Sequence, residues 1–286
     1  MAPEDLAAAL ADRAAAAAFP DGRAYRSLPP DAVRELAGQW DRPGWDVEAE
    51  ALDTGILPER YARNFRTFTP VDQARLLRSR VAVVGLGGLG GTVVEILARE
   101  GVGRLTLIDG DTFEASNLNR QLFSRPELLE TPKAAAAAHR VARVNPSVET
   151  AVHPLFLNAE NAGVLLEGAD LVVDCLDNLT DRFVLEAAAR EKGIPLVSAA
   201  IGGVAGHVTT VFPEDAGLSL IYGPPESAGK KGAERSLGTL PHAITVLSAL
   251  ECSEAVKLLR GAAPDLRNRL LLMDLADTTF QVLDLT

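Results

Sequence analysis

The stretch 80–121 constrains the fold of this chain more than any other part of the sequence. A first apolar run, 81–84, leads into a glycine cluster, and a helix-like stretch and a second apolar run, 105–108, follow it. This order of strand, tight turn, helix and strand is typical of a nucleotide-binding βαβ unit. Glycines let the backbone turn sharply and approach a ligand closely, and the free N–H groups at the helix start attract phosphate. The cluster consists of Gly85, Gly87, Gly88, Gly90 and Gly91, with Leu89 among them.

The second apolar run ends on an acid, Asp109. An acid about 20 residues beyond the glycines, at the end of the second strand, can accept hydrogen bonds from ribose hydroxyls. The glycines and this acid do not by themselves distinguish a dinucleotide enzyme from an enzyme that uses ATP. The polar residues that follow make this distinction.

Charged and amide side chains follow the ends of two expected strands. The C-terminal ends of the strands in an open α/β sheet converge on one crevice, so we expect these side chains to gather beside the glycine turn. Such a crevice offers a ribose acceptor, a carboxylate for a metal and two cations for a polyphosphate. The residues are Asp109, Asp111, Asn117, Arg120, Gln121 and Lys133 after one strand, and Asp174, Asp177 and Asn178 after another.

A metal site and two cations favour nucleotidyl transfer over hydride transfer. The transition state of nucleotidyl transfer spreads negative charge over the phosphoryl oxygens, whereas hydride transfer needs neither the metal nor the cations. The sequence contains no G-x-x-x-x-G-K-[ST] motif, which excludes a P-loop ATPase.

Strand and helix patterns alternate from residue 56 to the end of the chain. Continuous apolar runs early in this region are typical of parallel strands that are covered on both faces, and later runs such as GHVTTVF and FQVLDL indicate antiparallel strands. We predict an α/β fold with a Rossmann-like mixed sheet, which has a parallel nucleotide-binding half and an antiparallel C-terminal half. Strands are expected at 80–85, 104–109, 148–153, 170–175, 195–199, 206–212, 269–274 and 278–285, and helices at 69–78, 90–101, 132–144, 159–167, 179–193 and 240–260.

Residues 1–57 differ from the rest and are predicted to be a helical or irregular N-terminal extension to a domain over 58–286. The alanine-rich stretch 7–18 is expected to be helical, and several prolines break the stretch that follows it. Two interpretations remain open. The extension is either a surface appendage or partly mobile arm, or a segment that docks Trp40 and Trp45 onto the body or a partner.

Composition excludes several functional classes. A net charge of −11 and a pI near 4.9 argue against nucleic acid as the main partner, because an acidic surface repels phosphate. Two cysteines, Cys175 and Cys252, cannot form a disulfide framework or a four-cysteine zinc site. No apolar run is long enough to span a membrane, and the acidic start does not fit a signal peptide. We expect a cytoplasmic protein without a membrane or nucleic-acid partner.

Six motifs in this order resemble the MoeB/ThiF/HesA family, the bacterial relatives of ubiquitin-activating enzymes. The resemblance covers roughly 57 to the C-terminus, and the six motifs together are far more specific than the glycines alone. The motifs are Arg60-Tyr61-Ala62-Arg63, Gly85-Leu86-Gly87-Gly88-Leu89-Gly90, Asp109-Gly110-Asp111, Asn117-Leu118-Asn119-Arg120-Gln121, Thr131-Pro132-Lys133 and Asp174-Cys175-Leu176-Asp177-Asn178.

The resemblance implies an adenylyltransferase that uses ATP and Mg²⁺ and releases pyrophosphate. Its expected partner is a small ubiquitin-like β-grasp protein whose C-terminal Gly-Gly carboxylate becomes adenylated. We expect this partner to be a sulfur carrier of a thiamine, molybdopterin or related thiolation pathway. Proteins of this family usually work as homodimers, so the resemblance also implies a homodimer.

The resemblance assigns roles to individual positions. Asp109 corresponds to the ribose-binding acid, Asp177 to the Mg²⁺-linked carboxylate, and Arg63 to an arginine that reaches the γ-phosphate in the neighbouring subunit's site. The expected catalytic residues are Arg63, Arg120, Lys133 and Asp177. The expected nucleotide-binding residues are Gly85, Gly87, Gly88, Leu89, Gly90, Asp109, Asp111, Asn117, Arg120, Gln121, Lys133, Asp177 and Asn178.

The chain departs from the family at two places. Many relatives bind a structural zinc with two C-x-x-C pairs, but 217–222 contains no cysteine, and we predict no zinc. The ThiF-type branch also has a cysteine in the loop after the sheet, and 233–240 contains none. A covalent enzyme intermediate in that loop is therefore not expected. Cys175 and Cys252 are expected to be packing residues.

Two other functions stay open at this point. The chain could adenylate a tRNA-linked or small-molecule carboxylate, as in the threonylcarbamoyladenosine-cyclising branch, or it could be a non-catalytic nucleotide-binding scaffold. Asp174 could cap the following helix instead of contacting a ligand. The basic run 229–235 is either a solvated loop or a clamp on the partner's tail.

Overall fold

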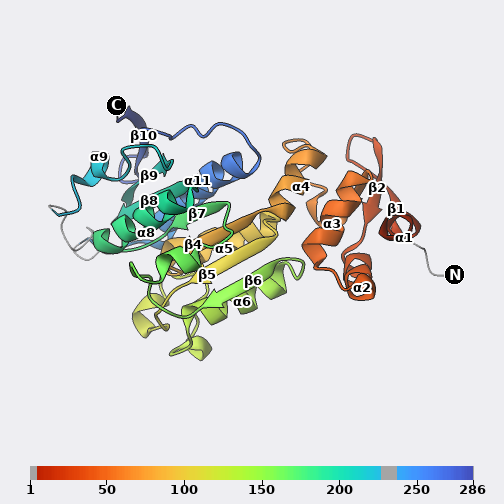
Figure 1. Ribbon diagram of the computed structural model, residues 1–286, viewed down its shortest axis with the longest axis horizontal. Coiled ribbons are helices and arrows are strands. Elements are labelled where there is room, and N and C mark those ends of the chain that lie inside the picture. The colour runs from red at the N-terminus through yellow and green to blue at the C-terminus, as the bar shows by residue number, and fades with distance from the viewer. Residues whose placement is uncertain (1–4, 227–236, 286) are drawn as a thin grey trace.

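An eight-stranded mixed sheet forms the centre of the computed structural model, which describes residues 5–226 and 237–285 (Figure 1). The strand order is β11-β10-β9-β8-β7-β4-β5-β6. The strands from β8 to β6 are parallel, and those from β8 to β11 are antiparallel. This confirms the predicted mixed sheet. The strands are β4 (Arg80–Val84), β5 (Arg104–Ile108), β6 (Glu149–His153), β7 (Leu171–Asp174), β8 (Leu196–Gly202), β9 (Ala205–Val211), β10 (Arg269–Asp274) and β11 (Thr279–Asp284).

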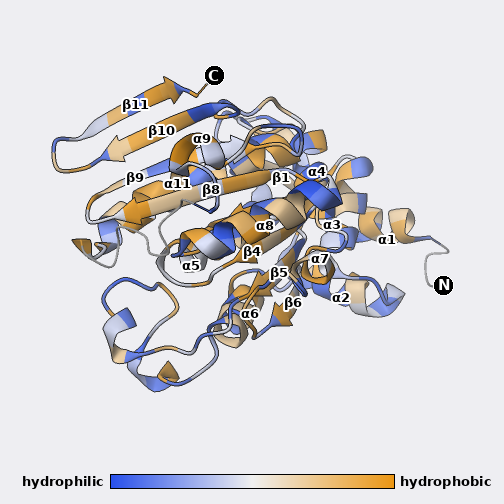
Figure 2. Ribbon diagram, turned by 60° about the vertical axis from the view of Figure 1, so that its left-hand side comes forward, coloured by the Kyte–Doolittle hydropathy of each residue, from blue (hydrophilic) through white to orange (hydrophobic). Residues whose placement is uncertain are grey.

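Helices cover both faces of the parallel half, as its continuous apolar strands require. In β4, Val81 and Val83 face a core that includes α5, α6 and α11, while Ala82 and Val84 face a second core with α7 and α8. Figure 2 shows the central strands as mostly hydrophobic, whereas the outer hairpin β10–β11 carries hydrophilic residues as well. No described helix is both long and apolar enough to cross a membrane. The helices are α4 (Pro70–Arg78), α5 (Gly88–Glu100), α6 (Lys133–Val144), α7 (Ala162–Leu165), α8 (Leu179–Lys192), α9 (Ser219–Tyr222) and α11 (Pro241–Leu259).

One expected helix is shorter than the sequence pattern indicated. The prediction covered 159–167, but α7 spans only Ala162–Leu165. The side chain of Asn158 accepts hydrogen bonds from the backbone N–H groups of Glu160 and Asn161. This local turn competes with helix formation and delays the start of α7.

The N-terminal residues form a small unit with its own sheet, in the order β1-β2-β3. These strands were not predicted from the sequence, and the predicted helix over 7–18 was wrong for 15–18, which pair with β2. Alanine favours helices, but strand pairing outweighs this weak local preference here. Strand β3 crosses the expected boundary at 57/58. The elements are α1 (Leu6–Arg13), β1 (Ala15–Ala18), β2 (Ala24–Leu28), α2 (Pro30–Trp40), α3 (Gly44–Asp53) and β3 (Ile56–Pro58).

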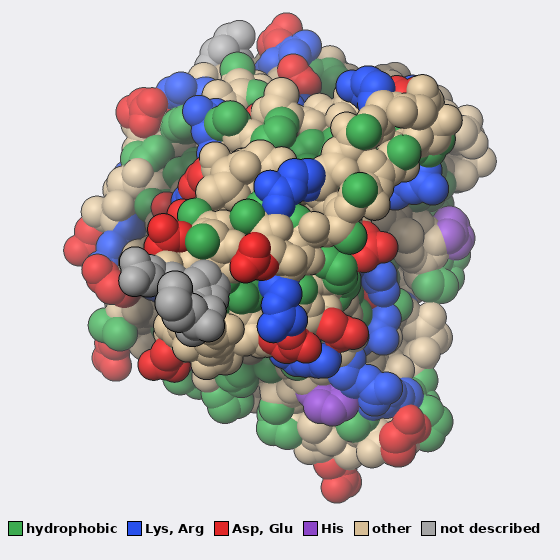
Figure 3. Space-filling view, turned by 90° about the vertical axis from the view of Figure 1, so that its right-hand side faces the viewer, with side chains coloured by type: hydrophobic (Ala, Val, Ile, Leu, Met, Phe, Trp, Pro, Cys, Tyr) green, Lys and Arg blue, Asp and Glu red, His purple; other side chains and the backbone are tan. Residues whose placement is uncertain are grey.

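Trp45 docks this N-terminal unit onto the sheet. Its indole N–H donates to Glu149 Oε2 at 2.7 Å, and the Arg104 guanidinium lies over its ring, 4.8 Å from the centroid. Trp40 does not dock, since it packs against the unit's own core. On the face of the molecule in Figure 3, acidic and basic side chains are interspersed. The N-terminal unit also carries exposed ion pairs, among them Arg13–Glu35.

A buried polar network links the N-terminal unit to the sheet. The Tyr61 hydroxyl donates to Glu48 Oε2 of α3 at 3.2 Å and accepts from Asn145 Nδ2 at the end of α6 at 3.0 Å. Glu48 is 2% exposed, and Tyr61 and Asn145 are fully buried. Burial raises the pKa of Glu48 from 4.5 to about 7, against the opposing effect of the Arg60 charge.

We predict that Glu48→Gln becomes more stable relative to the wild type as the pH rises from about 5 to about 8. Because the pKa of Glu48 is higher in the folded protein than in the unfolded chain, this carboxyl stabilises the wild type fully at pH values below the unfolded pKa of 4.5. The stabilisation is lost as the pH rises through the folded pKa of about 7. The relative gain should approach roughly 3 kcal/mol, measured by urea unfolding at several pH values. A difference independent of pH would contradict a protonated Glu48 in the folded protein.

Candidate nucleotide site

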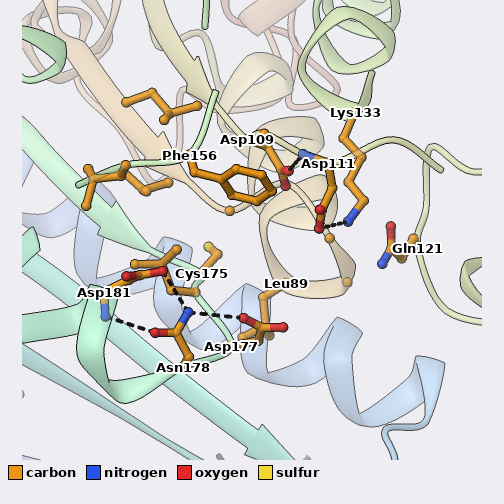
Figure 4. A pocket seen from close by; sticks show the side chains of 18 of the residues that line it. Leu89, Asp109, Asp111, Gln121, Lys133, Phe156, Cys175, Asp177, Asn178 and Asp181 are labelled. Carbon is orange, nitrogen blue, oxygen red and sulfur yellow. Dashed lines mark hydrogen bonds and ion pairs between the residues drawn. The ribbon is translucent and has the colours of Figure 1, made fainter. Parts of the chain in front are cut away.

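A pocket of about 220 Å³ lies at the carboxyl ends of β4, β5 and β7 (Figure 4). The structure brings together there most of the residues that the sequence predicted. Phe156, Cys175 and Ile244 add an apolar wall. The predicted residues that line it are Gly85, Gly87, Gly88, Leu89, Asp109, Asp111, Arg120, Gln121, Lys133, Asp177 and Asn178.

The glycine turn brings α5 against the end of β4. Gly85 has a φ of +86°, which favours glycine, and a Cβ there would lie 2.6 Å from the carbonyl oxygen of Cys175. A Cβ on Gly90 would lie 1.8 Å from the carbonyl oxygen of Gly85. Gly90 does not line the pocket, contrary to its expected place in the nucleotide site. Its contact with Gly85 instead seats the helix on the turn.

Helix α5 begins at the pocket without a side-chain cap. Its N-cap is Gly87, and the N–H of Gly91 is the one that donates to the Gly87 carbonyl. The N–H groups of the first turn therefore have no partner within the helix, and Gly88 and Leu89 line the pocket. Such a helix start binds anionic groups, phosphate above all.

Asp109 lies at the end of β5, held by two backbone donors. Its Oδ2 accepts from the N–H of Leu86 at 2.6 Å, and its Oδ1 accepts from the N–H of Asp111 at 2.8 Å. Burial raises the pKa of this carboxyl, while the Lys133 charge and the two N–H groups act in the opposite direction. The carboxylate is thus fixed in direction beside the glycine turn.

Lys133 and Arg120 supply positive charge on one side of the pocket. Lys133 is 7% exposed, and its Nζ lies 3.0 Å from Asp111 Oδ2. Arg120 donates to the Ser116 carbonyl at 2.6 Å, and no carboxylate of the described residues pairs with it. Buried Gln121 Oε1 has no hydrogen-bond partner within the described part of the chain, so it can accept a bond from a ligand.

Asn117 does not reach the pocket, although its loop does. Its Oδ1 accepts from the N–H of Glu114 at 3.0 Å, and the residue is 7% exposed. This bond closes the short 3-10 helix Ala115–Asn117 that precedes Arg120. In this structure Asn117 shapes the loop that carries the cation.

Asp177 and Asn178 line the side of the pocket opposite Lys133, as Figure 4 shows. Asn178 is the N-cap of α8, since its Oδ1 accepts from the N–H of Asp181 at 2.9 Å. Asp177 is exposed, and its Oδ1 lies 3.5 Å from Asn178 Nδ2. The described residues contain no group of three or more acidic, His or Cys side chains arranged for a metal. An exposed carboxylate beside a phosphate site suits Mg²⁺, which proteins bind through one or two carboxylates and substrate phosphates.

Asp174 neither caps α8 nor lines the pocket, so both alternatives considered for it were wrong. It is fully buried, and its Oδ2 accepts from Arg182 Nη1 at 2.7 Å and from the Ser198 hydroxyl at 2.6 Å. Arg182 is 3% exposed and also donates to the Leu176 carbonyl. This ion pair holds the backbone of 174–176 in place behind Asp177.

The loop after β6 also lines the pocket, although it was not among the predicted site residues. Phe156 is 63% exposed, and its ring lies beside Asp109 in Figure 4, where a Cβ on Gly110 would come within 2.6 Å of it. Leu155 and Leu157 line the same side of the pocket. The signal was available, because β6 is parallel to β5 and its following loop must lie at the same edge of the sheet.

The sequence model of the ThiF family matches residues 61–286. The chain belongs to the ThiF family. This match begins just after the N-terminal unit and includes the whole eight-stranded sheet.

Three relatives of this ThiF-family chain are named for their activities. The SAMP-activating enzyme E1 of Haloferax volcanii is 36% identical over 81% of this chain and 86% of its own length. The sulfur carrier protein adenylyltransferase of Thermus thermophilus is 36% identical over 75% of this chain and 81% of its own length. The molybdopterin-synthase adenylyltransferase of Escherichia coli is 34% identical over 83% and 95%.

Solved structures with less similar sequences share the fold. The crystal structure of E. coli MccB has a TM-score of 0.70 at 18% identity, and covers 79% of this chain and 69% of its own. The crystal structure of PaaA has a TM-score of 0.65 at 22% identity, and the match covers 80% of this chain and 82% of the PaaA chain.

Arg63 of the ThiF-family chain does not join the other predicted residues. It lies in the exposed turn after Tyr61, and the Tyr61 ring packs against Gly101, the C-cap of α5. The 13 residues of α5 span about 20 Å, and the pocket lies at the other end of that helix. An extended arginine side chain does not reach over that distance, so Arg63 cannot contact its own subunit's pocket.

A longer groove of about 640 Å³ opens from the pocket across the antiparallel half of the sheet. The groove and the pocket share Asp177, Asn178, Arg182 and Ile201. Its wall includes His207, whose Nε2 lies 2.7 Å from the Tyr222 hydroxyl. Burial, with the nearby Arg182 charge, lowers the pKa of His207 from 6.5 to about 4.

The stretch 217–222 is held by apolar packing instead of metal ligands. Leu218 is fully buried in the core with Leu185 and Val211, and its N–H donates to Glu186 Oε2 at 3.3 Å. The stretch 217–222 contains no cysteine or histidine that could bind zinc, and the absence of zinc stays a prediction. The basic run 229–235 lies entirely outside the described residues, in the gap 227–236. Cys175 and Cys252 are buried, and burial raises the pKa of both thiols, which suits packing residues.

We predict that Asp174→Asn costs about 3–5 kcal/mol of unfolding free energy, because it leaves the buried Arg182 without its counter-charge. Urea unfolding measures this loss. Ser198→Ala is the matched control, since it removes the hydroxyl that bonds to the same carboxylate and to Arg182 but keeps the ion pair, and should cost about 1.5–3 kcal/mol. Equal losses in the two variants would contradict the role of the ion pair.

Proposed function

We propose that this chain is an ATP-dependent adenylyltransferase that activates the C-terminal Gly-Gly carboxylate of a small ubiquitin-like sulfur carrier. One observation carries the proposal: a phosphate-binding helix start, two cations and a free carboxylate face one pocket, and a groove leads away from it. The names of three similar enzymes support the same class of reaction and substrate.

In the proposed complex, ATP lies across the start of α5. The N–H groups of Gly88 and Leu89 would bind phosphate oxygens, and Asp109 would accept hydrogen bonds from the ribose. The exposed Phe156 ring beside Asp109 offers a flat apolar surface for the adenine. Asp177 would hold Mg²⁺ together with phosphate oxygens, and the bound ion would neutralise part of their charge.

The proposed reaction needs no nucleophile from the protein. A carboxylate oxygen of the carrier attacks the α-phosphorus in line, and the bond from that phosphorus to the bridging oxygen of the β-phosphate breaks. Pyrophosphate leaves with the electron pair, and no proton is transferred. Lys133 and Arg120 stabilise the negative charge that develops on the pyrophosphate side.

The groove is the proposed path of the carrier's tail. It ends at Asp177 and Asn178, where the tail carboxylate would meet the α-phosphate. Its walls include Gly202, Ala205 and Gly206, which leave room for a narrow glycine-rich segment. We further propose a cytoplasmic homodimer, in which Arg63 contacts the triphosphate bound by the partner subunit.

Pyrophosphate–ATP exchange tests the proposal. We expect exchange with a small carrier ending in Gly-Gly, and none with tRNA or without a carboxylate substrate. Lys133→Met should lower the exchange rate by about 10²–10³-fold, the usual loss for one charge-stabilising donor. Exchange that requires tRNA would favour the alternative substrate, and no exchange with any substrate would support a scaffold.

We predict that Phe156→Ala weakens binding of a non-hydrolysable ATP analogue by roughly fivefold to 150-fold, since stacking on a base contributes about 1–3 kcal/mol. Isothermal titration calorimetry measures the change. Phe156→Tyr, which keeps the ring, is the matched control and should bind as the wild type does. Unchanged affinity in Phe156→Ala would place the adenine elsewhere.

A further inference from the structure

Glu48 and Tyr61 hold the turn that carries Arg63. Tyr61 lies two residues before Arg63, and the N–H of Asn64, directly after it, donates to the Tyr61 carbonyl at 2.8 Å. The Asn64 side chain donates in turn to Gln73 Oε1 of α4 at 2.9 Å. Arg63 is thus the exposed residue of a turn that is fastened on both sides.

On the N-terminal side of Arg63, the turn is held by the hydrogen bonds of a single group, the Tyr61 hydroxyl. The Tyr61 hydroxyl donates to Glu48 and accepts from Asn145, whose Nδ2 also donates to the Ala98 carbonyl of α5 at 2.9 Å. Gly101 leaves room for the ring, because a Cβ there would lie 2.7 Å from its Cε1 and Cζ atoms. Each partner of the hydroxyl is at most 2% exposed. A buried network of this kind tolerates few alternative positions of the ring.

Glu48 comes from outside the ThiF match. That match begins at Tyr61, whereas Glu48 belongs to α3 of the N-terminal unit. Trp45, one helical turn earlier, docks the same helix onto the sheet. The N-terminal unit therefore supplies one of the two hydroxyl partners that fix Tyr61.

We infer that the N-terminal unit, through Glu48 and Tyr61, positions Arg63 for the triphosphate of the partner subunit. This rests on the proposed function and on Arg63 acting across a homodimer. Glu48 and Tyr61 are positioning residues, because neither touches the pocket. A change at either should misplace Arg63 and slow the reaction while leaving the same subunit's own pocket intact. Small misplacements of a catalytic group cost up to about 10²-fold in rate.

The test uses mixtures of full-length variants that carry different tags, so that heterodimers can be isolated and assayed for pyrophosphate–ATP exchange. Tyr61→Phe removes only the hydroxyl, and Glu48→Ala removes its acceptor. Alone, each should lower exchange by roughly fivefold to 100-fold at saturating ATP. Glu48→Gln keeps an acceptor and should restore most of the rate.

Pairing the variants separates positioning from general damage. A Tyr61→Phe subunit paired with Asp177→Ala should regain activity, because the second subunit lends a well-placed Arg63 to an intact pocket. Tyr61→Phe paired with Arg63→Ala should stay impaired, since neither subunit supplies that arginine correctly. The reverse pattern, with recovery only in the Arg63→Ala pair, would mean that Tyr61→Phe damages its own pocket and would overturn the inference.

Two further measurements distinguish a failure of the proposed function from a failure of the inference about Arg63. If the wild type shows no exchange, the proposed function fails; if Arg63→Ala and Asp177→Ala do not complement each other in heterodimers, Arg63 does not act across the interface. Trp45→Phe is the matched control, because it removes the indole N–H bond at the same junction but keeps an aromatic ring there and both hydrogen-bond partners of the Tyr61 hydroxyl. It should keep the wild-type exchange rate, and a loss equal to that of Tyr61→Phe would indicate a general effect of loosening the N-terminal unit.

Discussion

Helix α5 sits so close to the turn beneath it that only glycine fits at the contact. The carbonyl of Gly85 occupies the place where a side chain of residue 90 would be, and this sets the position of the whole helix. At one end the helix presents its unpaired N–H groups to the pocket, and at the other Gly101 ends it with a φ of +91° and admits the Tyr61 ring. The same rigid element therefore connects the phosphate-binding turn with the N-terminal unit. A shift at either end would be transmitted along it, because packed helices move as units.

The change of strand direction explains why a groove meets the pocket. Parallel strands need crossover connections, and the crossover helices cover both faces of β4, β5 and β7. Strands β8 and β9 form one hairpin and β10 and β11 another, and the long connection from β9 to β10 contains α11, which packs against β8 and β9 on one face. The opposite face carries Ala200, His207 and Leu272 into the groove. A substrate that reaches the nucleotide along the sheet needs a face that no helix covers, and the antiparallel half of the sheet provides one.

The sequence predicted what backbone patterns and local chemistry determine. Continuous apolar runs placed the central strands, and the glycines with Asp109 and Lys133 placed the pocket, because each of these features acts within a few residues of itself. Contacts between distant segments were out of reach. Asp174 reads as a site residue in its motif, yet its partner Ser198 comes from another strand and removes it from the pocket. The strand over 15–18 needed knowledge of β2, and the position of Arg63 needed the length and direction of α5.

His207 gives the groove a constant charge. With a pKa near 4, its imidazole is neutral at every pH at which most cells operate, and its Nε2 lies 2.7 Å from the Tyr222 hydroxyl. Arg182 nearby is neutralised by Asp174. A chain bound in the groove would therefore meet the same uncharged imidazole in mildly acidic and in mildly alkaline conditions. His207 would not make binding in the groove depend on pH in that range, and any proton-dependent control would have to act through another group.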